Sequence, residues 1–207
     1  MNGVAAVIFD CDGVMFESSG ANIAYYNKIL SHFSYPPVLP DDHERAHLCH
    51  TASSPDVLRG LMKQEDVAPA LDFAAALDYR EFIPQMTPEA HLKEALASLS
   101  RRYPLAVATN RGRSIEPILE HFNFRDFFSV IVTSHDVERP KPAPDMLLLA
   151  AEKLGVAPDA CLFIGDSDLD RRAAEQAGIA FAGYGKQVES ARPLTTHLDL
   201  LGYFDLI

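Results

Sequence analysis

Residues 4–13 are the part of the sequence that most constrains the fold. Six apolar residues in a row are followed by Asp10, Cys11, Asp12 and Gly13. A short, continuous, β-rich apolar run is typical of a strand that is buried on both faces of a parallel sheet. Residues i and i+2 of an extended chain point to the same side, so Asp10 and Asp12 are expected to leave this strand side by side.

These two carboxylates make the end of the strand chemically unusual. Adjacent carboxylates repel each other unless a cation or a shared proton compensates, and Gly13 permits the sharp turn that follows. The pair therefore indicates a metal ion, an electrophile or both. The alternative is a simple turn after a strand, since Asp and Gly are common turn residues. The motifs in the rest of the chain decide between a functional site and an ordinary turn.

The remaining sequence divides into a helical part and an alternating part. Residues 17–85 contain no convincing strand pattern and are interpreted as a helical insertion. After them, strand patterns alternate with helix patterns, which indicates a parallel sheet with right-handed crossovers, hence an α/β fold. The later strands are expected at residues 105–108, 128–133, 160–164 and 179–182, and the helices at 88–100, 114–122, 143–154 and 168–177, with a further helix in the ambiguous stretch 194–204.

Polar residues follow three of the expected strands. These pairs are Asp10 with Asp12, Thr109 with Asn110, and Gly165 with Asp166. In open parallel sheets, ligands bind at the carboxyl ends of the strands. The three pairs are therefore expected to meet at one edge of the sheet.

Length and composition narrow the possible functions. A chain of 207 residues fits one domain, or a domain with a modest insertion. Its formal net charge of −11 argues against nonspecific binding to nucleic acid or to an anionic membrane, while a local cation still permits an anionic substrate. Three scattered cysteines predict reduced thiols in a cytoplasmic protein. The N-terminal sequence lacks a signal-peptide pattern, and no apolar run approaches the length of a membrane span.

Four motifs occur in order along the chain: D-C-D-G-V at residues 10–14, A-T-N-R at 108–111, R-P-K-P-A-P-D at 139–145 and I-G-D-S-D-L-D at 164–170. This set resembles the haloacid dehalogenase superfamily, within its phosphoglycolate phosphatase and β-phosphoglucomutase-like branch. The resemblance implies a three-layer Rossmann-like core, residues 1–16 and 86–207, and an inserted α-helical cap domain, residues 17–85. It also implies a Mg²⁺-dependent phosphatase that acts on a small phosphorylated metabolite through an aspartyl-phosphate. Both a monomer and a homodimer are left open.

The resemblance assigns a role to each motif residue. Asp10 is expected to be the nucleophile, and Asp12 the general acid that protonates the leaving oxygen and then the base that activates water. Thr109 would hydrogen-bond a phosphoryl oxygen with help from the Asn110 backbone. Lys141 would neutralise phosphate and hold Asp10 in place.

The magnesium site and its surroundings follow from the same resemblance. The Asp10 carboxylate, the Asp12 backbone carbonyl and Asp166 would hold Mg²⁺, which suits an ion that prefers a few protein oxygens plus water and phosphate. Asp170 is expected to orient Lys141 or a metal-bound water. The preferred interpretation of Asp168 is an acid at a helix N-terminus, where the helix dipole favours it.

Arg111 is a further candidate for substrate binding, because it lies beside the Thr-Asn pair. A cation there is expected to contact phosphate or a substrate carboxylate. The alternative is a surface arginine that precedes the next helix.

Asp12 separates the possible chemistries of the family. Dehalogenases and phosphonoacetaldehyde hydrolases lack an acid at this position, so Asp12 favours phosphoryl transfer from an ester. Two alternatives stay open: a phosphosugar mutase with the same motifs, and a non-catalytic module that binds a phosphorylated metabolite.

Three histidines in the insertion form a separate pattern. His43, Glu44 and His47 match H-E-x-x-H, and His50 lies one helical turn further on. Two histidines four residues apart on a helix can bind zinc, but a chance match is the preferred interpretation. A milder hypothesis places these histidines and Arg45 in the substrate pocket.

Overall fold

The computed structural model describes residues 3–186 and 188–204 of the chain. The chain divides into two compact units, Met1–Glu17 with Pro88–Ile207, and Ser18–Thr87. The chain passes between them at the two-residue strands β2 (Phe16–Glu17) and β3 (Thr87–Pro88). The assignment of residues 17–85 as a cap domain stays a prediction, because a division into compact units does not show what the second unit does.

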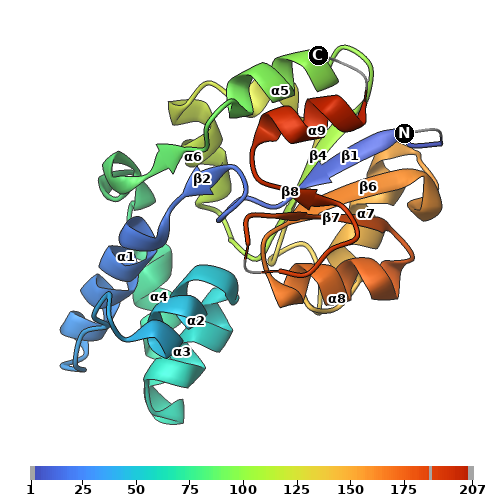
Figure 1. Cartoon of the computed structure of the whole chain (residues 1–207). Helices are drawn as coiled ribbons and strands as arrows, with labels where there is room; N and C mark the ends of the chain where they lie inside the picture. Colours follow the sequence, from blue (N-terminus) through green and yellow to red (C-terminus); the bar gives the residue numbers. More distant parts are fainter. Residues whose placement is uncertain (1–2, 187, 205–207) are drawn as a thin grey trace. The chain divides into compact units, whose positions relative to one another are not determined.

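The first unit is built on a six-stranded parallel sheet (Figure 1). The strand order is β5-β4-β1-β6-β7-β8, and every pair in it is parallel. The strands are β1 (Ala6–Phe9), β4 (Leu105–Thr109), β5 (Val130–Thr133), β6 (Cys161–Gly165), β7 (Ala180–Tyr184) and β8 (Pro193–Leu194). All four residues of β1 are fully buried, so the prediction of a strand buried on both faces is confirmed.

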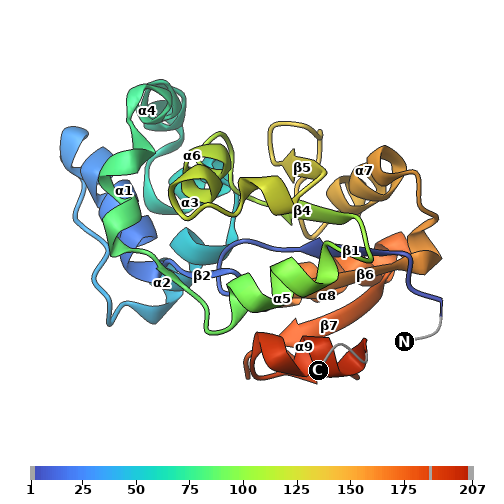
Figure 2. The ribbon, with the colours of Figure 1, turned by 90° about the horizontal axis from the view of Figure 1, so that it is seen from above.

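Helices cover both faces of this sheet, which gives the predicted three-layer α/β fold (Figures 1 and 2). The α-helices are α5 (Leu92–Leu99), α6 (Ile115–His121), α7 (Asp145–Leu154), α8 (Asp168–Ala177) and α9 (His197–Tyr203), with 3₁₀ turns η3 (Arg125–Phe127) and η4 (Pro158–Ala160). Ala6 and Ile8 of β1 pack in one hydrophobic core with residues of α7 and α8. On the other face, α5 and α9 pack against each other.

One predicted helix begins later than expected. The sequence pattern predicts a helix from residue 88, but Pro88 lies in β3 and α5 starts at Leu92. The Glu89 N–H donates instead to the Met15 carbonyl, at 2.9 Å, and His91 has a left-handed backbone with φ of 63°. A helix cannot continue through a left-handed residue, so tertiary contacts shorten its N-terminal end.

The second unit is helical up to β3 and has a core of its own. Its helices are α1 (Ser19–His32), α2 (His43–Thr51), α3 (Ser54–Leu61) and α4 (Gln64–Ala76), followed by the 3₁₀ turns η1 (Tyr79–Glu81) and η2 (Ile83–Gln85). Leu30, Val57, Leu58 and Ala70 are completely buried in its hydrophobic cluster. The hydroxyl of Tyr79 donates to Asn22 Oδ1 at 2.8 Å, a buried bond that ties η1 to α1.

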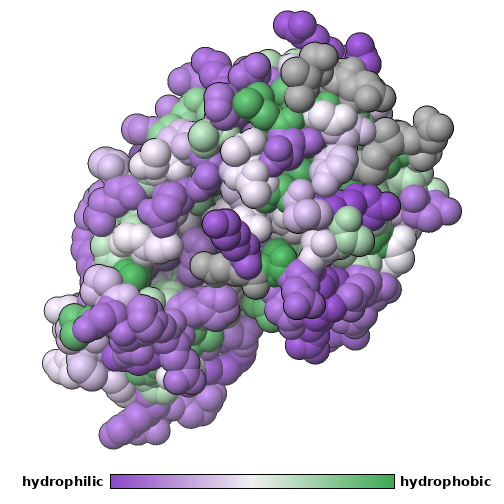
Figure 3. Space-filling view, viewed as in Figure 1, coloured by the Kyte–Doolittle hydropathy of each residue, from purple (hydrophilic) through white to green (hydrophobic). Residues whose placement is uncertain are grey.

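The surface of the molecule is mainly hydrophilic on the face drawn in Figure 3, where hydrophobic areas are small and separate. Among the described residues, Leu39 and Leu148 are the large hydrophobic side chains that are exposed. In the described part of the chain, no helix combines the length and the apolar character that crossing a membrane requires.

Candidate active site

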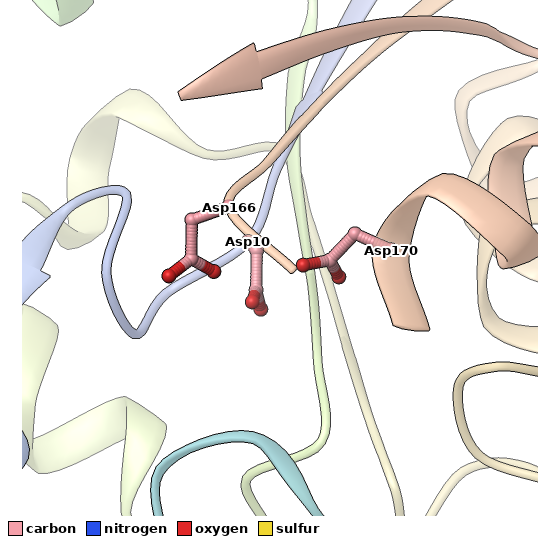
Figure 4. Close-up of side chains that lie close together, drawn as sticks. All are labelled: Asp10, Asp166 and Asp170. Carbon is pink, nitrogen blue, oxygen red and sulfur yellow. The ribbon is translucent and has the colours of Figure 1, made fainter. Parts of the chain in front are cut away.

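The acidic residues of the motifs gather at the carboxyl edge of the sheet. Asp10 directly follows β1, and Asp166 directly follows the neighbouring strand β6. Asp170 comes from the first turn of α8. Carboxylate oxygens of these three residues lie within 4.8 Å of one another, and Figure 4 shows their side chains converging. Carboxylate oxygens at this spacing are the ligand type that Mg²⁺ prefers.

A tight loop carries the second carboxylate past the end of β1. Gly13 has φ of 70°, a left-handed conformation that glycine adopts at little cost. Its N–H donates to the Phe16 carbonyl at 2.9 Å, and the Met15 N–H donates to the Cys11 carbonyl at 2.9 Å. These bonds fold the chain back immediately after Asp12. Only 7% of the surface of Asp12 is exposed. The sequence signal for a turn at Gly13 is therefore confirmed.

Lys141 supplies a buried positive charge between two of the carboxylates. Its Nζ lies 2.8 Å from Asp10 Oδ1 and 2.7 Å from Asp170 Oδ1. The lysine side chain is 2% exposed, so water contributes little to screening these ion pairs. Burial favours the neutral amine, but the two carboxylates outweigh this effect and raise the pKa of Lys141.

Asn110 fixes the backbone of the loop that carries this lysine. The Asn110 side-chain amide donates to the Lys141 carbonyl at 3.1 Å, and the Lys141 N–H donates to Asn110 Oδ1 at 3.0 Å. Sequence reasoning assigned Asn110 to substrate binding through its backbone and missed this side-chain role. A link between residues 31 positions apart leaves no trace in local periodicity.

Asp170 is held rigidly by a capping box at the start of α8. The Ser167 hydroxyl donates to Asp170 Oδ2 at 2.5 Å, and the Ser167 N–H donates to the same oxygen at 3.1 Å. A side chain at Gly165 would collide with this arrangement, because its Cβ would lie 2.3 Å from the Asp170 Cβ. Of the two expected roles for Asp170, the contact with Lys141 is present in the structure.

Arg111 pairs with the second motif carboxylate. Its Nη2 lies 2.5 Å from Asp12 Oδ1, and the residue is 9% exposed. Its backbone N–H donates to the Thr109 hydroxyl at 3.2 Å. The alternative interpretation of Arg111 as a surface arginine is therefore wrong.

Burial, with added negative charge from neighbouring aspartates, raises the pKa values of two carboxylates in the site. Burial, together with the charges of Asp170 and Asp12, raises the pKa of Asp10 to about 7, although Lys141 opposes this. Burial also raises the pKa of Asp166 well above its usual range, and the Asp170 and Asp10 charges add to the effect. A bound cation would relieve both effects by stabilising the carboxylates. The donors present therefore fit a divalent cation with oxygen ligands.

The neighbouring candidates fall outside this cluster. Asp168 is exposed and pairs with Arg171 one turn along α8, which agrees with its interpretation as an acid at a helix N-terminus. Burial, followed by the Asp12 charge, raises the pKa of the Cys11 thiol well above its usual range, so this cysteine is a poor nucleophile.

In the described part of the chain, the histidine pattern of the second unit is not part of a group of three or more side chains placed to hold a metal ion. Among the described residues, the aspartates at positions 10, 166 and 170 make up the group whose side chains can hold a metal ion. Arg45 donates to the Pro36 and Pro37 carbonyls at 3.2 Å each. This arginine therefore stabilises the start of α2.

The fold and this acidic edge define the chain as an α/β protein of the Rossmann-like type with a candidate metal site. The haloacid dehalogenase-like hydrolase family model matches residues 7–184. The chain therefore belongs to this family, and the family resemblance drawn from the four motifs is confirmed.

Two similar proteins of known name are phosphatases from Escherichia coli strain K12. A phosphoglycolate phosphatase is 37% identical over 111 residues, which are 50% of this chain and 44% of that protein. The match thus spans less than half of that relative. A fructose-1-phosphate phosphatase is 27% identical over 179 residues, which are 84% of this chain and 93% of that protein.

A solved structure with a similar fold extends the match to almost the whole chain. It is a haloacid dehalogenase superfamily hydrolase of subfamily IA, variant 1, from Geobacter sulfurreducens PCA. The TM-score is 0.84 at 36% sequence identity, over 97% of this chain and 99% of that one. The similarity thus includes both compact units.

Proposed function

We propose that this protein is a Mg²⁺-dependent phosphatase that hydrolyses a small phosphorylated metabolite through an aspartyl-phosphate on Asp10. The observation that carries the proposal is the place of Asp10, at the end of β1, 2.8 Å from the Lys141 ammonium and within the group of three aspartates. A carboxylate becomes a competent nucleophile when the charge on the phosphoryl group is neutralised.

The metal would be held by Asp10, Asp166 and the backbone carbonyl of Asp12. When bound, Mg²⁺ would neutralise phosphoryl oxygens and orient the group for in-line attack. Lys141 supplies a second, permanent positive charge beside Asp10. Thr109, the last residue of β4, offers its hydroxyl to a phosphoryl oxygen.

The reaction takes place in two halves. Asp12 enters the reaction protonated, in place of the carboxylate that pairs with Arg111 in the structure. First, an Asp10 carboxylate oxygen bonds to phosphorus while the bond from phosphorus to the ester oxygen breaks, and Asp12 gives its proton to that leaving oxygen. Then Asp12, now a carboxylate, takes a proton from water, whose oxygen bonds to phosphorus as the acyl-phosphate bond breaks. Inorganic phosphate leaves, and both side chains return to their initial state.

The substrate class is inferred from the similar proteins and from Arg111. One similar phosphatase is named for phosphoglycolate and the other for fructose 1-phosphate, so small phosphorylated acids and sugars are the candidates. The guanidinium of Arg111 is buried beside Asp12, and we assign it to binding phosphate or a substrate carboxylate. We also assign the unit Ser18–Thr87 to the role of a cap domain that helps select the substrate.

The test is hydrolysis of p-nitrophenyl phosphate and of a panel of phosphorylated acids and sugars, with Mg²⁺ and then with EDTA. Asp10→Asn is expected to lower kcat by more than about a thousandfold, because it removes the nucleophile. EDTA should abolish turnover by the unchanged protein. The matched control is Asp168→Asn, an exposed acid outside the cluster, which should keep kcat within about twofold.

Product analysis completes this test. Release of inorganic phosphate supports a phosphatase, whereas an isomerised sugar phosphate identifies a mutase. Full activity of Asp10→Asn, or activity that is indifferent to EDTA, would contradict the mechanism. Absence of turnover across the panel would favour the non-catalytic alternative.

A further inference from the structure

A buried histidine in the C-terminal helix touches the loop that carries the motif aspartates. His197 is the first residue of α9 and has no exposed surface. Its Nε2 lies 2.8 Å from the backbone carbonyl oxygen of Val14. A carbonyl oxygen only accepts hydrogen bonds, so the imidazole donates from Nε2. Val14 is itself completely buried. The hydrogen bond from His197 therefore gives the Val14 carbonyl the partner that a buried carbonyl needs.

Aromatic rings hold the imidazole in this position. The ring of Tyr184, at the end of β7, stacks on His197 with centroids 4.7 Å apart and planes at 27°. The ring of Phe9, the residue before Asp10, lies 6.4 Å away on a tilted plane. The histidine is therefore packed against the last residue of β1 as well as bonded to the loop that follows it.

Tyr184 extends the contact to the segment that returns from the second unit. Its hydroxyl donates to Glu89 Oε2 at 3.2 Å. The Glu89 N–H in turn donates to the Met15 carbonyl at 2.9 Å. A backbone hydrogen bond thus joins the loop before β2 to the residue after β3, and the side chains of Glu89 and Tyr184 join that residue to the sheet.

The start of α9 is built to keep His197 in place. Thr196 is its N-cap residue and forms a capping box with Asp199. Leu200 and Leu201 of the same helix are buried, and α9 packs against α5, as Figure 2 also shows. Because α9 is capped and packed, the backbone of His197 is held in place. The hydrogen bond from the imidazole therefore determines where the Val14 carbonyl lies.

We propose that His197 is a positioning residue for phosphoryl transfer: through the Val14 carbonyl, and with Tyr184 and Glu89, it fixes the loop that carries Asp12. The kinetic part of this inference rests on the phosphatase function proposed above. Acid–base catalysis depends on placing the reacting group within hydrogen-bond reach, and a displacement of about 1 Å can cost on the order of a hundredfold in rate. The imidazole touches neither substrate nor metal in this role.

The experiment compares two substitutions at the same position. His197→Phe keeps an aromatic ring but removes the donor, whereas His197→Gln keeps an N–H donor at a similar reach. We expect His197→Phe to lower kcat by about tenfold or more with KM changed less than about threefold, because Asp12 is displaced while substrate contacts remain. We expect His197→Gln to keep kcat within about threefold.

A structural control separates positioning from loss of stability. Leu201→Ala removes buried surface from the same helix but alters neither partner of the His197–Val14 hydrogen bond, so it should lower the melting temperature and leave kcat nearly unchanged. Amide hydrogen exchange provides a readout that needs no activity. His197→Phe should speed exchange in residues 11–17 and 87–92, and Leu201→Ala should not do so selectively.

The outcomes distinguish this inference from the proposed function. If the unchanged protein hydrolyses no phosphate ester, the function fails, and selective exchange in the two segments still decides whether His197 anchors them. Unchanged kcat and unchanged exchange in folded His197→Phe would overturn the inference. A kcat loss that Leu201→Ala reproduces at equal melting temperature would overturn it too.

Discussion

Stability at mildly acidic pH should depend on His197. Burial lowers the pKa of this imidazole to about 4 from its ordinary value of 6.5, although the hydrogen bond to the Val14 carbonyl works in the opposite direction. Between these two pH values the unfolded chain binds a proton at this site and the folded chain does not. The free energy of unfolding therefore falls as the pH drops through this window, and this contribution is fully present above it.

The size of the effect follows from the two pKa values. One pKa unit corresponds to about 1.4 kcal/mol, so the whole difference amounts to roughly 3 kcal/mol. At about pH 5 the linkage relation gives a loss of ~2 kcal/mol relative to about pH 8. This is a large share of the stability of an ordinary domain, which is about 5–15 kcal/mol.

The assay is urea unfolding followed by circular dichroism at about pH 8 and about pH 5. His197→Gln removes the titrating group and keeps a donor for Val14. Between about pH 8 and about pH 5, the free energy of unfolding of this variant should therefore fall by ~2 kcal/mol less than that of the unchanged protein. Other groups titrate equally in both proteins, and the difference isolates His197. Parallel losses, equal within about 0.5 kcal/mol, would refute the assigned burial and protonation of this histidine.

Two further predictions concern groups around the acidic cluster. Lys141→Met should lower the free energy of unfolding by about 3–5 kcal/mol in Mg²⁺-free urea titrations, because Asp10 and Asp170 lose their buried counter-charge; a loss below about 1 kcal/mol would contradict this ion-pair arrangement. Gly165→Ala should cost about 1–3 kcal/mol in the same titrations, since the new Cβ would lie 2.3 Å from the Asp170 Cβ. Its matched control is Gly20→Ala in α1, where nothing lies within 4 Å of the added Cβ and helix propensity favours alanine by up to ~1 kcal/mol; equal effects of the two substitutions would show that the close approach at Gly165 is absent.

Local patterns in the sequence were sufficient for the fold class and for five of the six strands of the sheet. The apolar run before Asp10 is fully buried in β1, because uninterrupted apolar residues need a strand with both faces covered. The alternation of strand and helix patterns likewise yielded the parallel sheet. The start of α5 was predicted wrongly, because the Glu89 N–H bonds to the distant Met15 carbonyl instead of entering a helix.

The roles of the site residues were only partly accessible in this way. Asp10 and Asp166 were predicted to meet because neighbouring parallel strands end at the same edge. The side-chain role of Asn110 was not predicted, since it depends on how the loop with Lys141 lies beside β4. His197 gave no signal at all, because a single histidine before a short helix matches no chemical motif.

The sequence by itself predicted the alternation of long strands and helices, the family and the positions of the acidic motif residues, whereas the two-residue strands β2, β3 and β8 were found only in the structure. Each of these predictions depends on hydrophobic periodicity or on residue types within a few positions of one another. Only the tertiary structure decided the pairing of Arg111 with Asp12, 99 residues apart, and of His197 with Val14, 183 residues apart. Such contacts depend on how whole helices and strands pack against one another. A buried charge or carbonyl then pairs with the side chain that this packing brings within reach.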